Sequence, residues 1–397
     1  MGGVLHLPRA LAVMEERGWD ALLATSHENV YYLSGFRSFG QPLIRGTQVY
    51  ALARRDRLDA PVVVAPVGEM DMAAQFPPRG AVIPYGTFHI AAPEEPVSGS
   101  DALLVRWGID EPPRPSAMEA LRDALGRLDL TGGVIGVDER GLLPALWQSL
   151  PERLPDGLRP APAADAFQVI RAVKTDREIE VLHRSASVVE QAMEQALASA
   201  EEGVQEQEMA RVFEGALVAL GARPLFSVIA FGPHAAYPNA VPGERRLRRG
   251  DLIRFDIGCL YQGYCSDIAR TAVFGDPTPR QRDYYRAIVA GEEAALSVLR
   301  PGIAASAVFE AAVEATRRAG IPHYRRHHVG HGIGLEIYDL PLLAPGAEMR
   351  LEAGMVLEVE TPYYEVGFGG LQVEDTVVVT GAGCRLLTAS DRTLRVV

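Results

Sequence analysis

Residues 252–259 read Leu-Ile-Arg-Phe-Asp-Ile-Gly-Cys, an apolar run with the carboxylate of Asp256 near its centre, and residues 264–267 read Tyr-Cys-Ser-Asp. With their neighbours, segments 251–259 and 264–274 predict two strands joined by a turn around Tyr261-Gln262-Gly263. In such a hairpin Asp256 and Asp267, one on each strand, can lie close together. A buried carboxylate is costly unless it is paired or bound to a metal. Paired or metal-bound aspartates are therefore one interpretation of this hairpin, and aspartates in surface or turn roles are the alternative.

Histidines gather further along the chain. Four of the nine lie close together, at His323, His327, His328 and His331. His331 is flanked by glycines in Val-Gly-His-Gly-Ile-Gly, residues 329–334, and glycine leaves room for a ligand near the backbone. Imidazole is a common metal ligand. A histidine cluster on a loop is more often solvated, and that alternative also stays open.

Two glutamates follow in strand-like runs, Glu360 in Leu-Glu-Val-Glu-Thr and Glu374 in Gln-Val-Glu-Asp-Thr. Alternation puts Glu358 and Glu360 on one strand face, which could simply be solvated. Two aspartates, two glutamates and one histidine together offer hard oxygen ligands and one imidazole. This set suits a pair of Mn²⁺, Co²⁺, Zn²⁺ or Fe²⁺ ions better than one structural zinc. The residues in the set are Asp256, Asp267, His331, Glu360 and Glu374.

The rest of the chain predicts two domains on either side of a proline-rich stretch. Before the stretch, helical and strand patterns alternate as in an α/β domain, with helices expected at 7–17 and 116–128 and strands at 21–24, 61–66 and 133–137. Residues 151–165 hold four prolines without any period, which predicts a linker. Beyond it, Thr175 and Glu178 have capping-box spacing. Helices at 205–220, 279–299 and 304–318, with strands at 355–361 and 371–380, then predict an α+β domain.

The net charge, the cysteines and the lengths of the apolar runs limit which binding partners and which cellular compartment we expect. The net charge of -12 and the pI near 5.3 disfavour nucleic acid or an anionic membrane surface as partner. Three cysteines, in no zinc-binding spacing, indicate reduced thiols. No apolar run reaches the 18 residues or so of a membrane span, and the N-terminus is not a convincing signal peptide. We therefore expect a cytoplasmic protein without a membrane partner.

Taken in order, the motifs resemble those of a known superfamily. Asp-Ile-Gly with a second aspartate eleven residues on, then Gly-His-Gly-Ile-Gly, Val-Glu-Thr and Val-Glu-Asp, resemble the methionine aminopeptidase, prolidase, aminopeptidase P and creatinase superfamily. Residues 29–36 look like the start of a creatinase-type N-terminal domain, and residues 171–175 like the start of the catalytic domain. The resemblance implies an α+β pita-bread metallohydrolase domain at 166–397. A smaller α/β creatinase-like N-terminal domain, at 1–158, precedes it.

The resemblance also implies roles for the five metal-binding candidates. Asp256 would hold one divalent ion, and His331 and Glu360 the other, while Asp267 and Glu374 would bridge the two. Two cations would activate a shared water and polarise the scissile carbonyl. Glu360 would also shuttle a proton. In addition, His327 matches a substrate-side histidine that stabilises an oxyanion.

The substrate-side positions depart from the prolidase pattern. Asn239 and Tyr338 stand where histidines are usual, and Gln372 stands where an arginine is often found. His234 could substitute for a missing histidine. Arg37 could clamp a substrate carboxylate across a dimer. For both, an ordinary loop or surface role remains the simpler alternative.

Three functions follow in order of preference. The first is a dinuclear-metal exopeptidase (manganese, zinc or cobalt) acting on dipeptides or short peptides as a homodimer, with proline selectivity and end preference open. The second is a C–N hydrolase of a small metabolite, similar to ectoine hydrolases. The third is a non-catalytic pita-bread module that binds proteins, which typically loses the ligands retained here.

Overall fold

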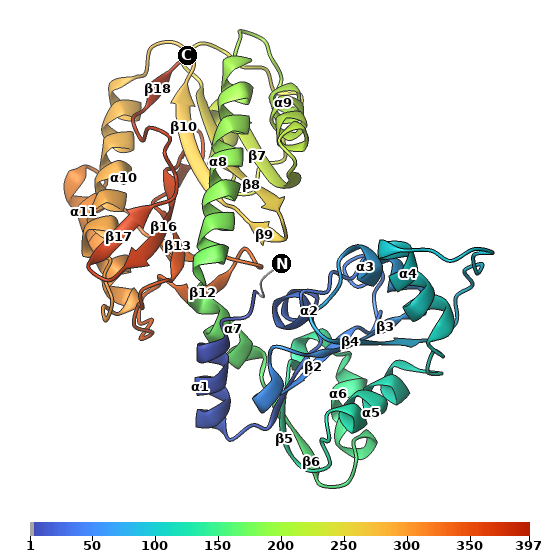
Figure 1. The fold of residues 1–397 in the computed structure, drawn as a ribbon. Helices are drawn as coiled ribbons and strands as arrows, with labels where there is room; N and C mark the ends of the chain where they lie inside the picture. The colour runs from blue at the N-terminus through green and yellow to red at the C-terminus, as the bar shows by residue number, and fades with distance from the viewer. Residues whose placement is uncertain (1–3) are drawn as a thin grey trace. The chain divides into compact units, whose positions relative to one another are not determined.

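The computed structural model describes residues 4–397 and divides into two compact units, one ending at Arg171 and the other beginning at Ala172 (Figure 1). The domain bounds expected from the sequence, 1–158 and 166–397, stay a prediction. Among the described residues no helix combines the length and the apolar character needed to cross a membrane.

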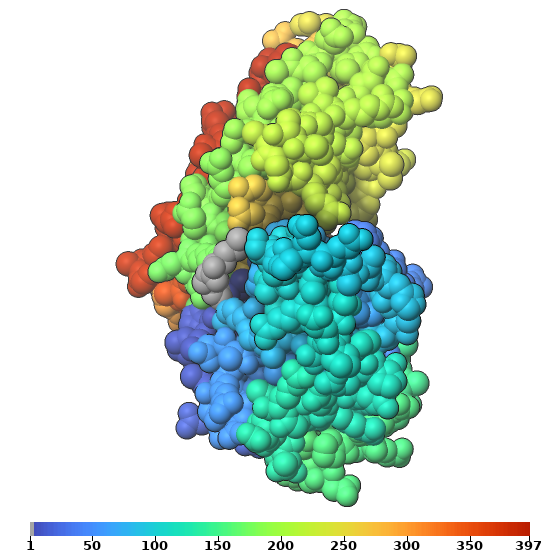
Figure 2. Space-filling view, turned by 45° about the vertical axis from the view of Figure 1, so that its right-hand side comes forward, coloured from blue at the N-terminus to red at the C-terminus, as the bar shows by residue number. Residues whose placement is uncertain are grey.

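The N-terminal unit contains one six-stranded mixed sheet in the order β4-β3-β2-β1-β5-β6. Buried aliphatic side chains, including Leu23, Leu52, Val64 and Ile135, form its core. The surface of this unit includes the cyan segment around α4 (Figure 2). Its strands are β1 (Ala21–Ala24), β2 (Tyr50–Arg54), β3 (Val62–Pro66), β4 (Ala81–Tyr85), β5 (Gly133–Val137) and β6 (Leu158–Pro162). Its helices are α1 (Leu7–Arg17), α2 (His27–Ser34), α3 (Met70–Gln75), α4 (Gly99–Val105), α5 (Ala117–Arg127) and α6 (Pro144–Arg153); the last residue of the following helix, α7 (Ala164–Ala172), is assigned to the second unit.

The linker predicted at residues 151–165 is wrong. Helix α6 continues to Arg153, β6 spans Leu158–Pro162, and α7 begins at Ala164. Strand β6 lies at the edge of the sheet and pairs only with β5 among the described residues. An edge strand tolerates proline because one side of its backbone needs no partner. Pro160 and Pro162 therefore mark an edge strand rather than a break between domains.

The C-terminal unit is built on a ten-stranded sheet, with the main order β12-β11-β13-β16-β10-β8-β7 and with β9, β17 and β18 paired at its sides. Four long helices accompany it: α8 (Asp176–Ala198), α9 (Glu206–Ala219), α10 (Pro279–Val298) and α11 (Ala305–Ala319). The strands are β7 (Arg223–Phe231), β8 (Leu252–Tyr261), β9 (Tyr264–Cys265), β10 (Ile268–Val273), β11 (Gly330–Gly332), β12 (Asp339–Leu342), β13 (Val356–Glu360), β16 (Glu374–Thr380), β17 (Gly383–Leu386) and β18 (Arg395–Val396). A separate pair joins β14 (Tyr363–Glu365) to β15 (Gly369–Leu371).

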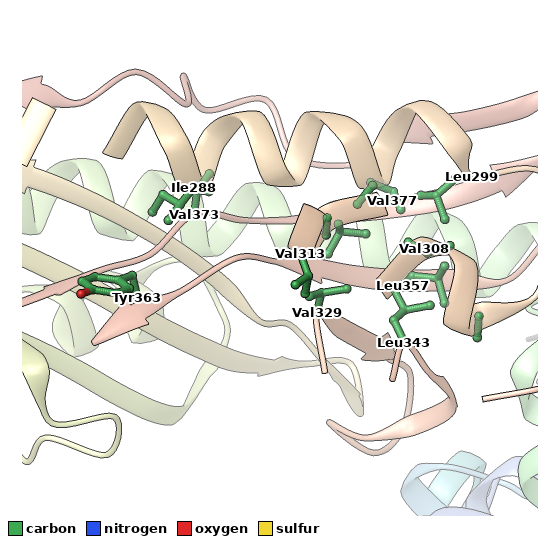
Figure 3. Packing of buried hydrophobic residues seen from close by; sticks show 14 of the residues in the cluster. Ile288, Leu299, Val308, Val313, Val329, Leu343, Leu357, Tyr363, Val373 and Val377 are labelled. Atoms are coloured by element: carbon green, nitrogen blue, oxygen red, sulfur yellow. The ribbon is translucent and has the colours of Figure 1, made fainter. Parts of the chain in front are cut away.

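Alternation along the strands separates a helix-covered face of this sheet from a polar face. On β8, Ile253, Phe255 and Ile257 pack in one cluster with apolar residues of α8 and α9. Successive strand side chains point to opposite faces, so Arg254 and Asp256 project the other way. Apolar residues of strands β13 and β16 likewise pack in one cluster with apolar residues of α10 and α11. Figure 3 shows side chains of that second cluster, among them Ile288, Val308, Val313, Leu357, Val373 and Val377.

The hairpin predicted from the opening motif is present. Strand β8 pairs antiparallel with β9 and β10, and Tyr261 faces Tyr264 across the turn. The two turn residues, Gln262 and Gly263, have φ of 51° and 90°. Glycine tolerates this left-handed conformation, and two such residues in succession make the tight turn whose twist suits a hairpin.

The predicted capping box of α8 is also present. Glu178 N donates to Thr175 Oγ1 at 3.3 Å, and Thr175 N donates to Glu178 Oε2 at 2.8 Å. We expect Thr175→Ala to lower the free energy of unfolding by about 1 kcal/mol, because the first turn of the helix loses its side-chain acceptor. Urea denaturation at fixed metal content measures this change. Thr175→Ser keeps the acceptor and is the control, and equal stability of the two variants would contradict the capping role.

Candidate metal centre

Three acidic side chains and one alanine form a row across four strands of the polar face. The register pairs Asp256 on β8 with Ala269 on β10, Ala269 with Glu374 on β16, and Glu374 with Glu360 on β13. Directly opposed residues of antiparallel strands project to the same face. The three carboxylates of this row therefore converge, and the small Ala269 side chain leaves space between two of them. We call these four residues the carboxylate row.

Asp267 and His331 form a tight group with Glu374. One ligand atom from each of the three lies within 4.8 Å of the others, and His331 Nε2 is 3.7 Å from Asp267 Oδ2. All three side chains are buried. His331 Nδ1 is 3.0 Å from Gly332 O, which can only accept a hydrogen bond. Nδ1 therefore carries the hydrogen, and Nε2 presents its lone pair to the group.

The electrostatics of this group fit a bound cation. Burial, together with repulsion from neighbouring carboxylates, raises the pKa of Asp267 and of Glu374 well above the usual range. Burial also raises the pKa of Asp256 to about 6, although Arg254 opposes the shift. Asp267 Oδ1 is buried and has no hydrogen-bond partner among residues 4–397. Buried, mutually repelling oxygens with an unpartnered atom are the surroundings that a divalent ion stabilises.

Glu360 differs from the other carboxylates of the row. Burial alone would raise its pKa, but hydrogen bonding to His328 and the charge of Arg326 outweigh that effect and lower it. Its Oε1 is 3.1 Å from His328 Nδ1 and 3.4 Å from Arg326 Nη2. Glu360 is therefore the group most readily ionised in this part of the sheet. Glu358, which the alternation could have placed on a solvated face, is fully buried and accepts a hydrogen bond from Thr376.

Two neighbouring members of the histidine cluster, His327 and His328, have different surroundings. His327 is exposed, and its ring centroid lies 4.2 Å from that of His328 in an edge contact. The buried His328, which the sequence interpretation did not select, contacts Glu360 directly. Its position two residues before the Gly-His-Gly motif gave no signal to separate it from His327. The Tyr338 ring stacks on the His331 ring, with 3.9 Å between the ring centroids. The Tyr338 hydroxyl oxygen lies 3.5 Å from His328 Nε2.

The remaining substrate-side candidates have different surroundings. Gln372 Nε2 donates to Glu360 Oε2 at 3.4 Å, so this side chain borders the carboxylate row. His234 is held by Glu206, 2.8 Å from its Nδ1, and Asn239 is exposed. Arg37 belongs to the N-terminal unit, where it donates to Tyr31 Oη at 3.0 Å. The structure thus brings Gln372 and Tyr338 to the acidic group, while the roles of all these residues stay predictions.

Comparison with known proteins decides the family. The model of metallopeptidase family M24 matches residues 180–381, and that of the creatinase/prolidase N-terminal domain matches residues 6–173. The chain belongs to metallopeptidase family M24. Membership confirms the resemblance drawn from the motifs. It also implies divalent metal ions, which the donor set around Asp267 fits.

Individual relatives agree with the family. An Xaa-Pro dipeptidase of Pyrococcus furiosus is 35% identical over 232 residues, 58% of this chain and 67% of the relative. A second, from Pyrococcus horikoshii, is 34% identical over 58% of this chain, and the match spans 66% of that relative, just under two thirds. The solved prolidase of Pyrococcus furiosus covers 96% of this chain and 99% of its own, at 27% identity and a TM-score of 0.75. The α+β pita-bread unit and the α/β creatinase-like unit expected from the sequence are thereby confirmed.

Proposed function

We propose that this M24 metallopeptidase is a dinuclear-metal exopeptidase that hydrolyses dipeptides or short peptides. The observation that carries the proposal is the buried group of Asp267, His331 and Glu374, extended along the carboxylate row to Asp256 and Glu360. The relatives named Xaa-Pro dipeptidase support a substrate of this class.

These five residues would hold two divalent ions, of manganese, zinc or cobalt. Such ions lower the pKa of water and polarise a carbonyl, which is the chemistry that peptide hydrolysis needs. His331 presents a neutral Nε2, because burial lowers its pKa and Gly332 O holds the hydrogen on Nδ1. Hard carboxylate oxygens with one imidazole suit these metals.

Glu360 would accept a proton from the attacking water and return it to the leaving amine. Its lowered pKa keeps it ionised before the reaction, as a general base must be. His327, at the exposed edge of the histidine pair, and Tyr338, stacked on His331, would contact the substrate. Imidazole and phenol groups can both donate a hydrogen bond to the oxyanion that forms at the carbonyl.

Substrate selection would depend on Tyr338 and on four further side chains, those of Arg37, His234, Asn239 and Gln372. Three of them replace residues usual in prolidases, so we expect non-proline dipeptides to be accepted as well. We further propose that the protein is a cytoplasmic homodimer, with its N-terminal domain at 1–158 and its catalytic domain at 166–397.

A dipeptide panel tests this function. We expect metal-dependent hydrolysis of dipeptides with and without proline, and loss of activity when one terminus is blocked, which identifies the end that is recognised. Metal content by mass spectrometry is measured on the same preparation. Bound metal without hydrolysis of any peptide would favour a C–N hydrolase of a small metabolite. Absence of bound or activating metal would instead favour the non-catalytic binding module.

A further inference from the structure

A second polar row lies beside the carboxylate row. Arg254 on β8 is opposite Thr271 on β10. Thr271 Oγ1 donates to Gln372 O at 3.0 Å and accepts from Gln372 N at 2.8 Å. Arg254 and Gln372 stand two residues before Asp256 and Glu374, so they project to the same face of the sheet. Arg254, Thr271 and Gln372 therefore border the candidate metal centre.

Arg254 donates hydrogen bonds to side chains and to main-chain carbonyls around this second row. Its side chain is fully buried, and Nη1 donates to Asp256 Oδ2 at 3.1 Å and to Gln372 Oε1 at 2.9 Å. The other nitrogens donate to main-chain carbonyls of residues 235–238, at 2.7 to 3.0 Å. Guanidinium donors have a fixed planar geometry, so these bonds orient all their acceptors together. One side chain thus fixes a candidate metal ligand and the backbone next to Asn239.

Gln372 connects Arg254 to Glu360 by hydrogen bonds. Its Oε1 accepts from Arg254 Nη1 and from Tyr364 Oη, the latter at 3.1 Å. An amide with its oxygen held by two donors must turn its nitrogen the opposite way. That nitrogen, Nε2, is 3.4 Å from Glu360 Oε2. A continuous chain of hydrogen bonds therefore runs from Asp256 through Arg254 and Gln372 to Glu360.

We propose that Arg254 and Gln372 form a positioning pair that sets the separation of Asp256 and Glu360 for two metal ions. The same guanidinium orders the substrate-side segment 235–238. This inference rests on the proposed metal centre. The resemblance leads one to expect an arginine at position 372, and the structure instead places a guanidinium from the strand beyond β10 against the glutamine there.

Removal and exchange of the pair test the proposal. Arg254→Gln is expected to weaken Mn²⁺ binding to metal-stripped protein by about 10- to 100-fold, the usual cost of losing a partner of a metal ligand. Its KM should rise as well, because segment 235–238 is released. Gln372→Arg puts two guanidiniums side by side and should also weaken binding. The double variant, Arg254→Gln with Gln372→Arg, restores one guanidinium and one amide and should recover Mn²⁺ affinity to within roughly tenfold of the unaltered protein.

Calorimetric titration with Mn²⁺ measures the affinity of each variant for the ion and requires no catalytic activity. A protein that binds Mn²⁺ but hydrolyses no peptide would refute the proposed function and still allow this test. Arg318→Gln removes an arginine paired with Glu314 on the surface of α11 and is the matched control, expected to bind Mn²⁺ normally. Unchanged affinity of Arg254→Gln would overturn the proposal. If that variant does not fold, the double variant decides alone: recovery supports the pair, and weaker binding or failure to fold overturns it.

Discussion

Replacement of His331 by alanine is expected to reduce kcat/KM for dipeptide hydrolysis by roughly 10⁴-fold or more, the scale of losing one member of a catalytic unit. His331 supplies the imidazole of the group with Asp267 and Glu374, and its Nε2 lies 3.7 Å from Asp267 Oδ2. Without it, the carboxylates of Asp267 and Glu374 lose the neutral ligand that completes their group. Steady-state kinetics with added Mn²⁺, together with the metal content of each preparation, measure the effect.

The control for this substitution is His89→Ala, which removes an exposed histidine of the N-terminal unit. It should hydrolyse dipeptides at the unaltered rate. Activity of His331→Ala above a tenth of the unaltered level, at matched Mn²⁺ content, would rule out His331 as a ligand.

Metal removal is expected to make thermal stability depend on pH. Folding raises the pKa of Asp256 to about 6 and those of Asp267 and Glu374 well above their usual range, mainly through burial. These groups bind protons more tightly in the folded state than in the unfolded state. The stability that comes from their protonation is complete below pH of about 4 and is lost as the pH rises through about 6. The Tm of metal-free protein should therefore fall from pH 5 to pH 8.

Manganese should reverse this loss. An ion present at about 1,000 times its Kd adds about 4 kcal/mol, which corresponds to roughly 8–16 °C in Tm for a domain of this size. The increase should be larger at pH 8 than at pH 5, because protons compete with the ion for the carboxylates. Differential scanning calorimetry at both pH values measures it. The control is Asp283→Asn, on the surface of α10 and paired with Arg286, which should respond like the unaltered protein. A metal-free Tm that rises with pH would contradict the assignment.

Local signals explain which parts of the fold could be predicted. The bounds of α1, β1 and β5 match those predicted, because apolar period and glycine stops define them within the segment itself. The hairpin of β8 and β10 was predictable for the same reason. The strand expected at 371–380 begins only at Glu374, since residues 369–371 belong to β15, which pairs with β14. The break between β15 and β16 depends on the pairing of β15 with β14. The alternation of apolar and polar residues within the segment does not show it.

In the candidate site, too, residues within sequence motifs could be predicted, whereas residues that matter through contacts with distant segments could not. Ordered motifs indicated Asp256, Asp267, His331, Glu360 and Glu374, and the register places three of them in one row. His328 and Arg254 were not selected, because their importance comes from contacts with Glu360 and Gln372 on distant segments. Only the fold shows that His327 is exposed and that His328 contacts Glu360, since both are histidines beside the same glycine motif.

The register of the carboxylate row also fixes when the site can form during synthesis of the chain. Strand β8, with Asp256, emerges from the ribosome long before β16, which must pair with both β10 and β13 to bring Glu374 between Ala269 and Glu360. A nascent chain that ends before β16 lacks Glu374 and the strand that joins the hairpin of Asp256 and Asp267 to β13, which carries Glu360. Ion capture by the complete site therefore follows translation of β16.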